Sequence, residues 1–252
     1  MKIALTLYTL REYVKIPPDM AVTFRRIKEI GYNTVQLSAL GPVDTEELRK
    51  MLDDAGLEVC ATHVSYDRLK NDLDRLIEEH FILRCPHIAI GSLPAEMRSK
   101  SGYKQFAIEA SEIGRKILES GLDFSYHNHA FELANFDGKT GLEILYEESD
   151  RKAVLAEIDT YWIQYGGGDP AFWIRKMKNR IKVVHFKDMG IINNTPTMFE
   201  VGEGNLNWGE IIDACKYSGA EWFVVEQDVC QRDPFESVRI SFQNMVSMGL
   251  HP

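Results

Sequence analysis

Residues 154–188, VLAEIDTYWIQYGGGDPAFWIRKMKNRIKVVHFKD, contain two apolar runs separated by a helical pattern. The runs predict β-strands at residues 154–159 and 182–186, because each is short and rich in β-branched or apolar residues. Between them, Asp169 followed by Pro170 is typical of a helix start, with an N-cap residue and a first-turn proline. Two strands joined through a helix imply parallel pairing by a right-handed crossover.

The same alternation continues through the rest of the chain. Amphipathic helical segments separate the strands, and two of them end at Gly31 and Gly56, which suit a left-handed C-cap. Eight strand and helix pairs in 252 residues match a closed (β/α)₈ TIM barrel that forms one domain over residues 1–252. The six further strands are predicted at residues 3–7, 34–38, 58–63, 87–90, 123–127 and 222–226.

A doubly wound open sheet is the competing architecture. It would carry a glycine-rich phosphate-binding loop after its first strand. Here the first strand continues into YTLREYVKIPPD at residues 8–19, and neither GxGxxG nor GxxxxGK[ST] occurs. The barrel is therefore favoured, and in a barrel the reactive side chains lie at the C-terminal ends of the strands.

Composition excludes several classes of protein. The chain is 44% hydrophobic and has 12 Phe, 10 Tyr and 4 Trp, enough apolar material for a large core. A total of 29 Lys and Arg against 38 Asp and Glu gives a formal net charge of −9, and no basic run is longer than two residues. Nucleic acids and anionic membranes are therefore poor partners for this chain.

The cysteines and the N-terminus indicate the compartment. The four cysteines lie far apart and form no CxxC motif: Cys60, Cys85, Cys215 and Cys230. This spacing favours reduced thiols. Only eight uncharged residues separate Lys2 from Arg11, too few for a signal peptide, and no stretch of eighteen apolar residues occurs. We expect a cytoplasmic protein.

The ends of the predicted strands carry histidines and carboxylates. The sixth strand ends AEID, the seventh VVHFKD and the eighth VVEQD. Asp159, His185 and Glu226 therefore end three consecutive strands and should converge at the barrel mouth. Two carboxylates and an imidazole suit Mn²⁺ or Zn²⁺, with Mg²⁺ or Co²⁺ as further options. The competing interpretation is a solvated mouth of ordinary ion pairs with Lys187 and Arg232.

A fourth metal ligand has two candidates near the fifth strand, which ends SYHNHAFE. Glu132 could fold back from the loop, or His127 could bind the metal directly. Alternation along the strand directs His127 and His129 to the same face. We favour Glu132 as the ligand, with His127 close by. Glu157 would lie one layer deeper in the barrel, either as an acceptor that orients a ligand or in a buried ion pair.

Other side chains at the mouth are candidates for substrate binding. Tyr8 and His63, near the ends of the first and third strands, suit hydrogen bonds to hydroxyl groups. Trp162 suits stacking on the apolar face of a sugar ring. Residues 190–207 are long for a strand-to-helix connection and contain GEG, so we expect a lid in which Glu203 reaches the substrate.

With these segments the chain resembles the xylose isomerase-like TIM-barrel superfamily, in particular its sugar phosphate isomerase/epimerase group, over essentially all 252 residues. The resemblance implies a divalent metal held by a fifth-strand Glu together with Asp159, His185 and Glu226. The chain departs from the ketose 3-epimerases because no fifth-strand Glu precedes Glu132. Trp162 also stands where those epimerases place a substrate-binding histidine. The stretches that carry the resemblance are YHNHAFEL, EIDTYWIQYGGGDP, VVHFKDM, EVGEGNLNW and EWFVVEQDVCQRDP.

The resemblance implies a sugar isomerase or epimerase that removes a proton next to a carbonyl through an enediolate. In this scheme Glu226 binds the metal and can act as the base, and Glu132 would double as an acid/base group. His127 or His129 transfers a proton or binds a hydroxyl. Lys187 stabilises the developing negative charge.

Other activities fit the same superfamily. Loss of a β-hydroxyl instead of proton return would give a lyase or dehydratase of a keto-inositol or 3-keto-glycoside. A non-catalytic carbohydrate-binding barrel and an abasic-site endonuclease are weaker alternatives, the latter because it needs more histidines and a basic face. The expected partner is a small sugar or keto-sugar, and the sequence leaves a homo-oligomer open.

Overall fold

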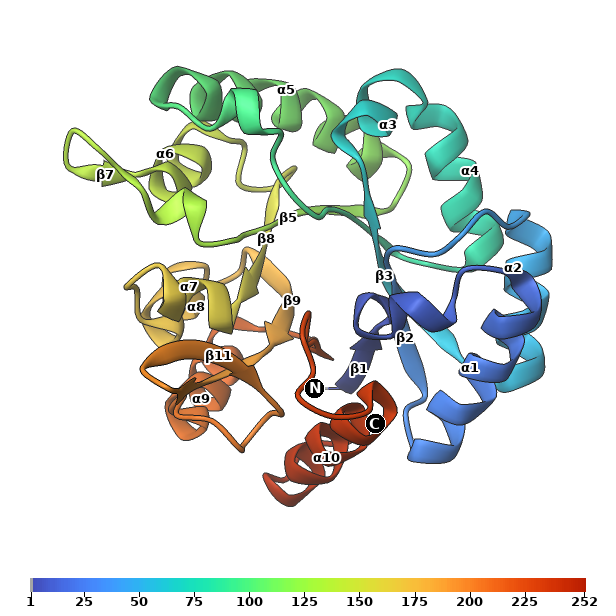
Figure 1. Ribbon diagram of the computed structural model, residues 1–252. Helices are drawn as coiled ribbons and strands as arrows, with labels where there is room; N and C mark the ends of the chain where they lie inside the picture. Colours follow the sequence, from blue (N-terminus) through green and yellow to red (C-terminus); the bar gives the residue numbers. More distant parts are fainter. Residues whose placement is uncertain (1) are drawn as a thin grey trace.

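A computed structural model describes residues 2–252 of the chain (Figure 1). Parallel strands close into a barrel in the order β1-β12-β9-β8-β5-β4-β3-β2, which is a TIM barrel. The barrel strands are β1 (Lys2–Thr6), β2 (Thr34–Leu37), β3 (Glu58–Val64), β4 (His87–Ile90), β5 (Asp123–His127), β8 (Leu155–Asp159), β9 (Ile181–Phe186) and β12 (Trp222–Val225). Each predicted strand agrees with its observed counterpart to within one residue at either end.

Helices surround the barrel on the outside (Figure 1). They are α1 (Pro17–Ile30), α2 (Thr45–Ala55), α3 (Tyr66–Asn71), α4 (Leu73–Leu83), α5 (Lys100–Glu119), α6 (Gly141–Glu148), α7 (Thr160–Tyr165), α8 (Pro170–Lys176), α9 (Trp208–Ser218) and α10 (Pro234–Ser247). The predicted cap of α8 is confirmed, because the Asp169 carboxylate accepts hydrogen bonds from the backbone N–H groups of Ala171 and Phe172. Gly31 and Gly56 end their helices with φ of 124° and 68°, conformations that favour glycine.

Shorter elements fill the connections at the C-terminal ends of the strands. They are the 3₁₀ helices η1 (Leu7–Tyr13), η2 (Ala95–Met97) and η3 (Phe131–Leu133), and the hairpins β6 (Asn135–Phe136) with β7 (Lys139–Thr140) and β10 (Asp188–Ile192) with β11 (Thr195–Phe199). The β10–β11 hairpin occupies much of the segment predicted to be a loop. Its two turn residues, Asn193 and Asn194, have φ of 48° and 63°, as a two-residue type I′ turn requires.

The core has two parts. A large apolar cluster includes outward-facing strand residues such as Ile158, Phe186 and Phe223 together with the inner faces of the helices. A much smaller cluster inside the barrel is formed by Ala4, Cys60, Ala61, Val183 and Val224. Alternation along β8 and β9 places Glu157 and His185 in the interior, and both are fully buried. Since burying charge is costly without partners, these positions require specific contacts.

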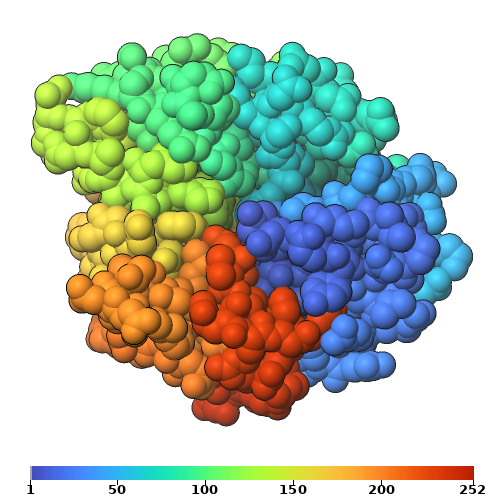
Figure 2. Space-filling view, viewed as in Figure 1, coloured from blue at the N-terminus to red at the C-terminus, as the bar shows by residue number. Residues whose placement is uncertain are grey.

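The first and last strands close the barrel. β1 pairs with β12 in parallel register, from Lys2 opposite Trp222 to Leu5 opposite Val225. Figure 2 shows the resulting face, on which the blue N-terminal segment meets the red segment that follows β12. In residues 2–252 no helix combines the length and the apolar character needed to cross a membrane.

Candidate active site

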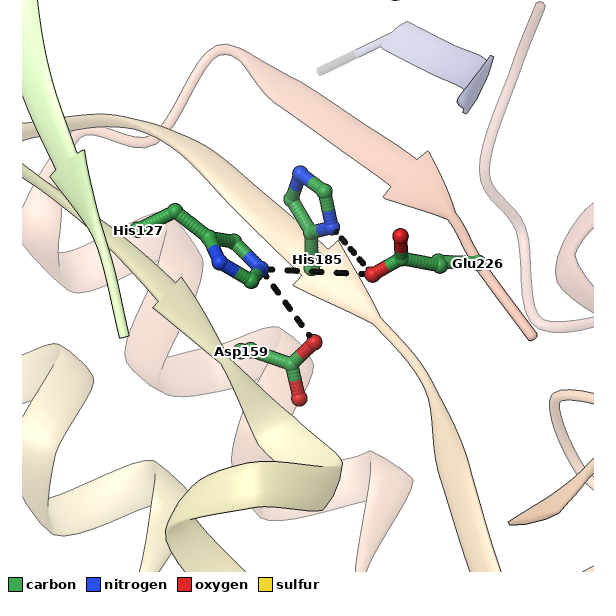
Figure 3. A group of neighbouring side chains, drawn as sticks. All are labelled: His127, Asp159, His185 and Glu226. Atoms are coloured by element: carbon green, nitrogen blue, oxygen red, sulfur yellow. Dashed lines mark hydrogen bonds and ion pairs between the residues drawn. The ribbon is translucent and has the colours of Figure 1, made fainter. Parts of the chain in front are cut away.

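Four side chains from four strands meet at the C-terminal end of the barrel (Figure 3). His127 ends β5, Asp159 ends β8, His185 lies in β9, and Glu226 directly follows β12. All four are buried, and one ligand atom of each lies within 4.8 Å of the others. We call this group the four-residue cluster.

The orientation of His127 is fixed from the side away from the cluster. Its Nδ1 lies 3.3 Å from the carbonyl oxygen of Gly91, to which it donates, so Nε2 carries a lone pair. Nε2 faces the carboxylates, at 3.4 Å from Asp159 Oδ2 and 3.9 Å from Glu226 Oε2. Burial, together with the nearby His185 and His63, lowers the pKa of His127 well below its usual value. His127 is therefore a neutral imidazole that points a lone pair into the cluster.

The donor atoms of the cluster fit a divalent cation. His127 Nε2 and Asp159 Oδ2 are buried and have no hydrogen-bond partner in the described part of the chain, although they face each other. Buried polar atoms are nearly always partnered, so this pair needs an explanation. Two imidazole nitrogens and two carboxylate oxygens form a ligand set typical of Zn²⁺ or Mn²⁺. The residues that would hold the ion are His127, Asp159, His185 and Glu226.

His185 lies between two carboxylates. Its Nδ1 is 2.9 Å from Glu226 Oε2, and its Nε2 is 2.9 Å from Glu157 Oε1. Burial alone would lower the pKa of His185, but the charges and contacts of Glu226 and Glu157 raise it to about 10. Without an ion the ring is therefore an imidazolium. A bound ion would take the place of the proton on Nδ1, and metal binding would release that proton.

Lys187 places a positive charge beside the cluster. Its Nζ lies 2.6 Å from Asp228 Oδ1, 3.2 Å from Glu226 Oε2 and 3.6 Å from Asp159 Oδ2. Burial acts to lower the pKa of Lys187, but these carboxylates raise it above its ordinary value, so the ammonium group stays charged. The site is therefore a buried charge network and not a solvated mouth of ordinary ion pairs. Arg232 contributes to a different contact, with Glu200.

A cavity of about 260 Å³ opens onto the cluster. The residues that line it are Tyr8, Ser38, His63, Gly91, Ser92, His127, His129, Lys187, Glu226 and Asp228. Tyr8, His63 and His129, proposed from the sequence as substrate-binding residues, all lie on its wall. A larger cavity of about 510 Å³ is lined by residues at strand starts, including Glu58 and Trp222. Because TIM barrels place their active sites at the opposite end, the smaller cavity is the candidate site.

Four residues of the cavity wall were not predicted from the sequence: Ser38, Gly91, Ser92 and Asp228. Asp228 follows Glu226 by two residues, so the alternation that directed Glu226 inward could have found it. Ser38 ends the predicted second strand, and its hydroxyl lies 3.3 Å from His63 Nδ1. All four positions come just after the C-terminal end of a barrel strand, where the reactive side chains of a TIM barrel lie.

Trp162 lies next to two residues of the cavity wall. The indole ring lies 5.4 Å from the His129 ring, centroid to centroid, and the Lys187 ammonium is 5.0 Å from its centroid. It is not part of the cavity wall formed by residues 2–252. Trp162 thus packs against His129 and Lys187, and direct stacking on a sugar remains a prediction.

Glu132 does not lie in the four-residue cluster, contrary to the preference for it as the fourth ligand. Its carboxylate is buried and accepts hydrogen bonds from the Tyr126 hydroxyl at 2.6 Å and from the His129 backbone N–H at 2.9 Å. The physical reason is η3, the short turn after β5, which directs Glu132 toward Tyr126 on the outer side of the strand. Burial raises the pKa of Glu132 to about 7. His127 occupies the place expected for the fifth-strand ligand.

Glu203 also lies away from the cavity wall. Its carboxylate accepts a hydrogen bond from the side-chain amide of Asn244 on α10. The segment around it is held by Asp188, whose carboxylate accepts hydrogen bonds from the N–H groups of Gly202, Gly204 and others in the turn. The prediction that Glu203 reaches the substrate from a lid is therefore not matched, because hairpin pairing and Asp188 fix this segment.

The sequence matches a known family model and part of a curated relative. Residues 24–243 match the family model of the xylose isomerase-like TIM barrel. An inosose dehydratase from Geobacillus thermodenitrificans is 30% identical over 144 residues, which cover 50% of this chain and 48% of the relative. The alignment thus spans about half the length of that curated relative.

Solved structures share the fold over nearly the whole chain. A sugar phosphate isomerase/epimerase from Parabacteroides distasonis superposes with a TM-score of 0.80 at 23% identity, covering 97% of this chain and 93% of the other. A D-allulose 3-epimerase from Methylomonas sp., in complex with D-allulose, gives a TM-score of 0.74 at 12% identity, covering 98% and 96%. At these identities the two structures support the fold alone.

Proposed function

The chain belongs to the xylose isomerase-like TIM-barrel family, and from that premise we propose that it is a divalent-metal-dependent isomerase or epimerase of a carbohydrate. The observation that carries the proposal is the four-residue cluster, whose ligand atoms lie within 4.8 Å of one another at the C-terminal strand ends. Mn²⁺ or Zn²⁺ suits these ligands. A bound ion would polarise a substrate carbonyl and thereby stabilise the enediolate that forms when a neighbouring proton is removed.

The side chains around the cluster supply the proton transfer and the charge stabilisation. Glu226 lines the cavity, and its carboxylate is the proposed base. The Lys187 ammonium, held by Asp228, stabilises negative charge on the substrate oxygen. His129 lies on the cavity wall and has a buried Nδ1 without a hydrogen-bond partner among residues 2–252, so it can accept a hydrogen bond from a substrate hydroxyl.

The charges of the cavity favour an uncharged sugar over a sugar phosphate. Its wall carries one lysine ammonium, Lys187, and two carboxylates, Glu226 and Asp228. Both carboxylates already lie against that ammonium, at 3.2 and 2.6 Å. With a divalent ion bound, the ion and Lys187 would be balanced by Asp159, Glu226 and Asp228, so the wall formed by residues 2–252 offers a phosphate group no unpaired cation. We therefore propose a free sugar or keto-sugar as the substrate.

A dehydratase is the second candidate, favoured by the match to an inosose dehydratase. The first step is the same, because dehydration next to a carbonyl also begins with removal of the neighbouring proton. The two reactions differ in their second step: the proton returns in an isomerase or epimerase, whereas a β-hydroxyl leaves as water in a dehydratase. The product distinguishes them.

The test is deuterium exchange in D₂O with Mn²⁺ and a panel of ketoses, keto-inositols and 3-keto-glucosides, with NMR as the readout. We expect deuterium at the carbon next to the carbonyl of one substrate class, and a product that is either an epimer, an isomer or an unsaturated ketone. Asp159→Asn should abolish the exchange, because it removes one ligand. Absence of exchange with every compound, together with no stoichiometric divalent ion after purification without chelator, would instead support a non-catalytic carbohydrate-binding barrel.

A further inference from the structure

Glu157 lies one layer below the four-residue cluster and is fully buried. Its Oε1 accepts hydrogen bonds from Gln36 Nε2 at 2.8 Å and His63 Nε2 at 2.7 Å, and lies 2.9 Å from His185 Nε2. Its Oε2 accepts the hydroxyl hydrogen of Ser125 at 2.9 Å. One carboxylate thus contacts side chains from four other strands of the barrel.

These contacts determine which nitrogen of each histidine carries hydrogen. An ionised carboxylate can only accept, so the nitrogens that face Glu157 must be donors. His63 therefore carries hydrogen on Nε2 and leaves Nδ1 toward Ser38 on the cavity wall. His185 Nε2 lies 2.9 Å from the same oxygen in an ion pair that lacks hydrogen-bond geometry, so Nε2 carries the proton that faces Glu157, and Nδ1 faces the cluster. The two rings lie parallel, 5.4 Å apart with an interplanar angle of 13°, as expected if one oxygen aligns both.

We propose that Glu157 is a positioning residue that sets the tautomer and ring orientation of His63, on the cavity wall, and of His185, in the cluster, at the same time. This inference rests on the proposed function, because His185 acts there as a metal ligand. A carboxylate behind a ligating histidine typically contributes about 10-fold to 100-fold in metal affinity. The feature particular to this chain is that the same oxygen also holds His63. Binding of the ion and binding of the sugar are therefore coupled through one side chain.

The carboxylate of Glu157 is itself held from the opposite side. The Ser125 hydroxyl lies 2.7 Å from Nε2 of His87, which begins β4. The other ring nitrogen of His87 is 3.9 Å from Asp123, which accepts a hydrogen bond from Lys182 at 2.6 Å. This row of polar groups runs from the strand starts to Glu157. Removing the Ser125 hydroxyl should therefore loosen Glu157 without removing a contact of His63 or His185.

The experiment compares Glu157→Gln and Ser125→Ala with a matched control, Glu200→Gln. Glu200 is a carboxylate of similar burial, 1% exposed, that accepts a hydrogen bond from Ser237. Each protein is titrated with Mn²⁺ alone, and its histidine tautomers are read from long-range ¹H–¹⁵N NMR spectra of the ion-loaded protein with Zn²⁺. KM and kcat are measured with the substrate found in the exchange panel.

We expect Glu157→Gln to weaken Mn²⁺ binding by about 10-fold to 100-fold. It should also raise KM several-fold and remove the Nε2–H preference of His63 and His185. Ser125→Ala should change the same quantities in the same direction but less, and Glu200→Gln should leave Mn²⁺ affinity and tautomers at the wild-type values. If Glu157 had only a structural role, all three variants would be less stable, but Mn²⁺ affinity and the histidine tautomers would not change selectively in Glu157→Gln and Ser125→Ala.

Wild-type Mn²⁺ affinity and wild-type tautomers in a folded Glu157→Gln protein overturn the proposal and leave the proposed function intact. If that variant does not fold, Ser125→Ala decides in the same way: unchanged affinity and tautomers overturn the proposal. A wild-type chain that binds no Mn²⁺ and exchanges no substrate proton overturns both the proposed function and this inference.

Discussion

At the scale of single residues, the barrel interior near the C-terminal strand ends contains charged groups where apolar side chains usually lie. Glu157, Asp159, His185 and Lys187 are each at most 1% exposed. Burying a charge is costly unless counter-charges and hydrogen bonds offset that cost. Here the two cationic groups lie within 4 Å of the carboxylates. Each member of the network therefore depends on the others, and removal of one should be measurable.

Glu226→Gln should lower the exchange rate by at least a factor of about 10², the usual contribution of a placed proton-transfer group. The variant keeps the size of the side chain but loses the charge that faces Lys187 and His185. The measurements are deuterium exchange with the active substrate and circular dichroism to show that the fold is intact. An unchanged rate in a folded variant would remove Glu226 from the mechanism.

His80 should make stability depend on pH. It is buried on α4, with Nε2 2.7 Å from the Thr62 hydroxyl and Nδ1 2.6 Å from the Leu76 carbonyl, and burial lowers its pKa to about 4. Between pH 6.5 and 4 the unfolded chain takes up a proton that the folded chain does not. The free energy of unfolding is therefore highest above pH 6.5 and falls by up to about 3 kcal/mol as the pH drops to 4.

The check on His80 is urea unfolding of the wild type and His80→Gln at pH 7 and pH 4.5. The variant lacks the titrating ring, so its free energy of unfolding should fall less over this range than that of the wild type. Parallel loss in the two proteins would show that His80 does not cause the dependence.

At the scale of elements, Asp188 organises the turn between β11 and α9. Its carboxylate accepts hydrogen bonds from four backbone N–H groups and from the Trp208 indole N–H, the last at 2.7 Å. A carboxylate that accepts several N–H groups resembles an anion held in a nest of backbone donors. Gly204 approaches so closely that an added Cβ would lie 2.4 Å from Asp188 Oδ1. This turn is a fixed part of the barrel mouth.

Asp188→Asn should lower the free energy of unfolding by about 2–3 kcal/mol, because the amide NH₂ would face N–H donors that the carboxylate accepts. Hydrogen exchange of residues 200–208 should become faster in the variant. The control is Asp213→Asn on α9, whose side chain is 68% exposed and should matter little. Equal stability of the two variants would show that the turn does not depend on the Asp188 charge.

The same elements show how far sequence reasoning reaches. Strand positions were predictable because apolar runs, glycine caps and proline starts are local signals. The positions of strand ends led to the choice of Asp159, His185 and Glu226 as metal ligands. Alternation along the fifth strand made His127 a further candidate. The preference for Glu132 failed because η3, a turn outside the alternation rule, directs that side chain to Tyr126. The β10–β11 hairpin was missed although Asn193 and Asn194 between two strand-like runs are a hairpin signal.

At the scale of the whole molecule, the cluster joins four strands, so a bound ion should stabilise the entire barrel. At 100 times its Kd, Mn²⁺ should raise the free energy of unfolding by about 2.7 kcal/mol. For a chain of this size that corresponds to a rise in Tm of roughly 5–10 °C. Thermal unfolding with EDTA and with MnCl₂ measures it, and Asp159→Asn should show no such rise. A wild-type Tm that is the same in both buffers would contradict binding at this site.

Closure of the barrel by β1 and β12 has a consequence for synthesis on the ribosome. Glu226 comes directly after β12, and β12 lies between β1, made first, and β9. During translation, His127, Asp159 and His185 leave the ribosomal exit tunnel well before Glu226 does. The proposed ion would therefore be acquired late, once translation has passed the last barrel strand, and cellular metal supply would act on chains that have already been made.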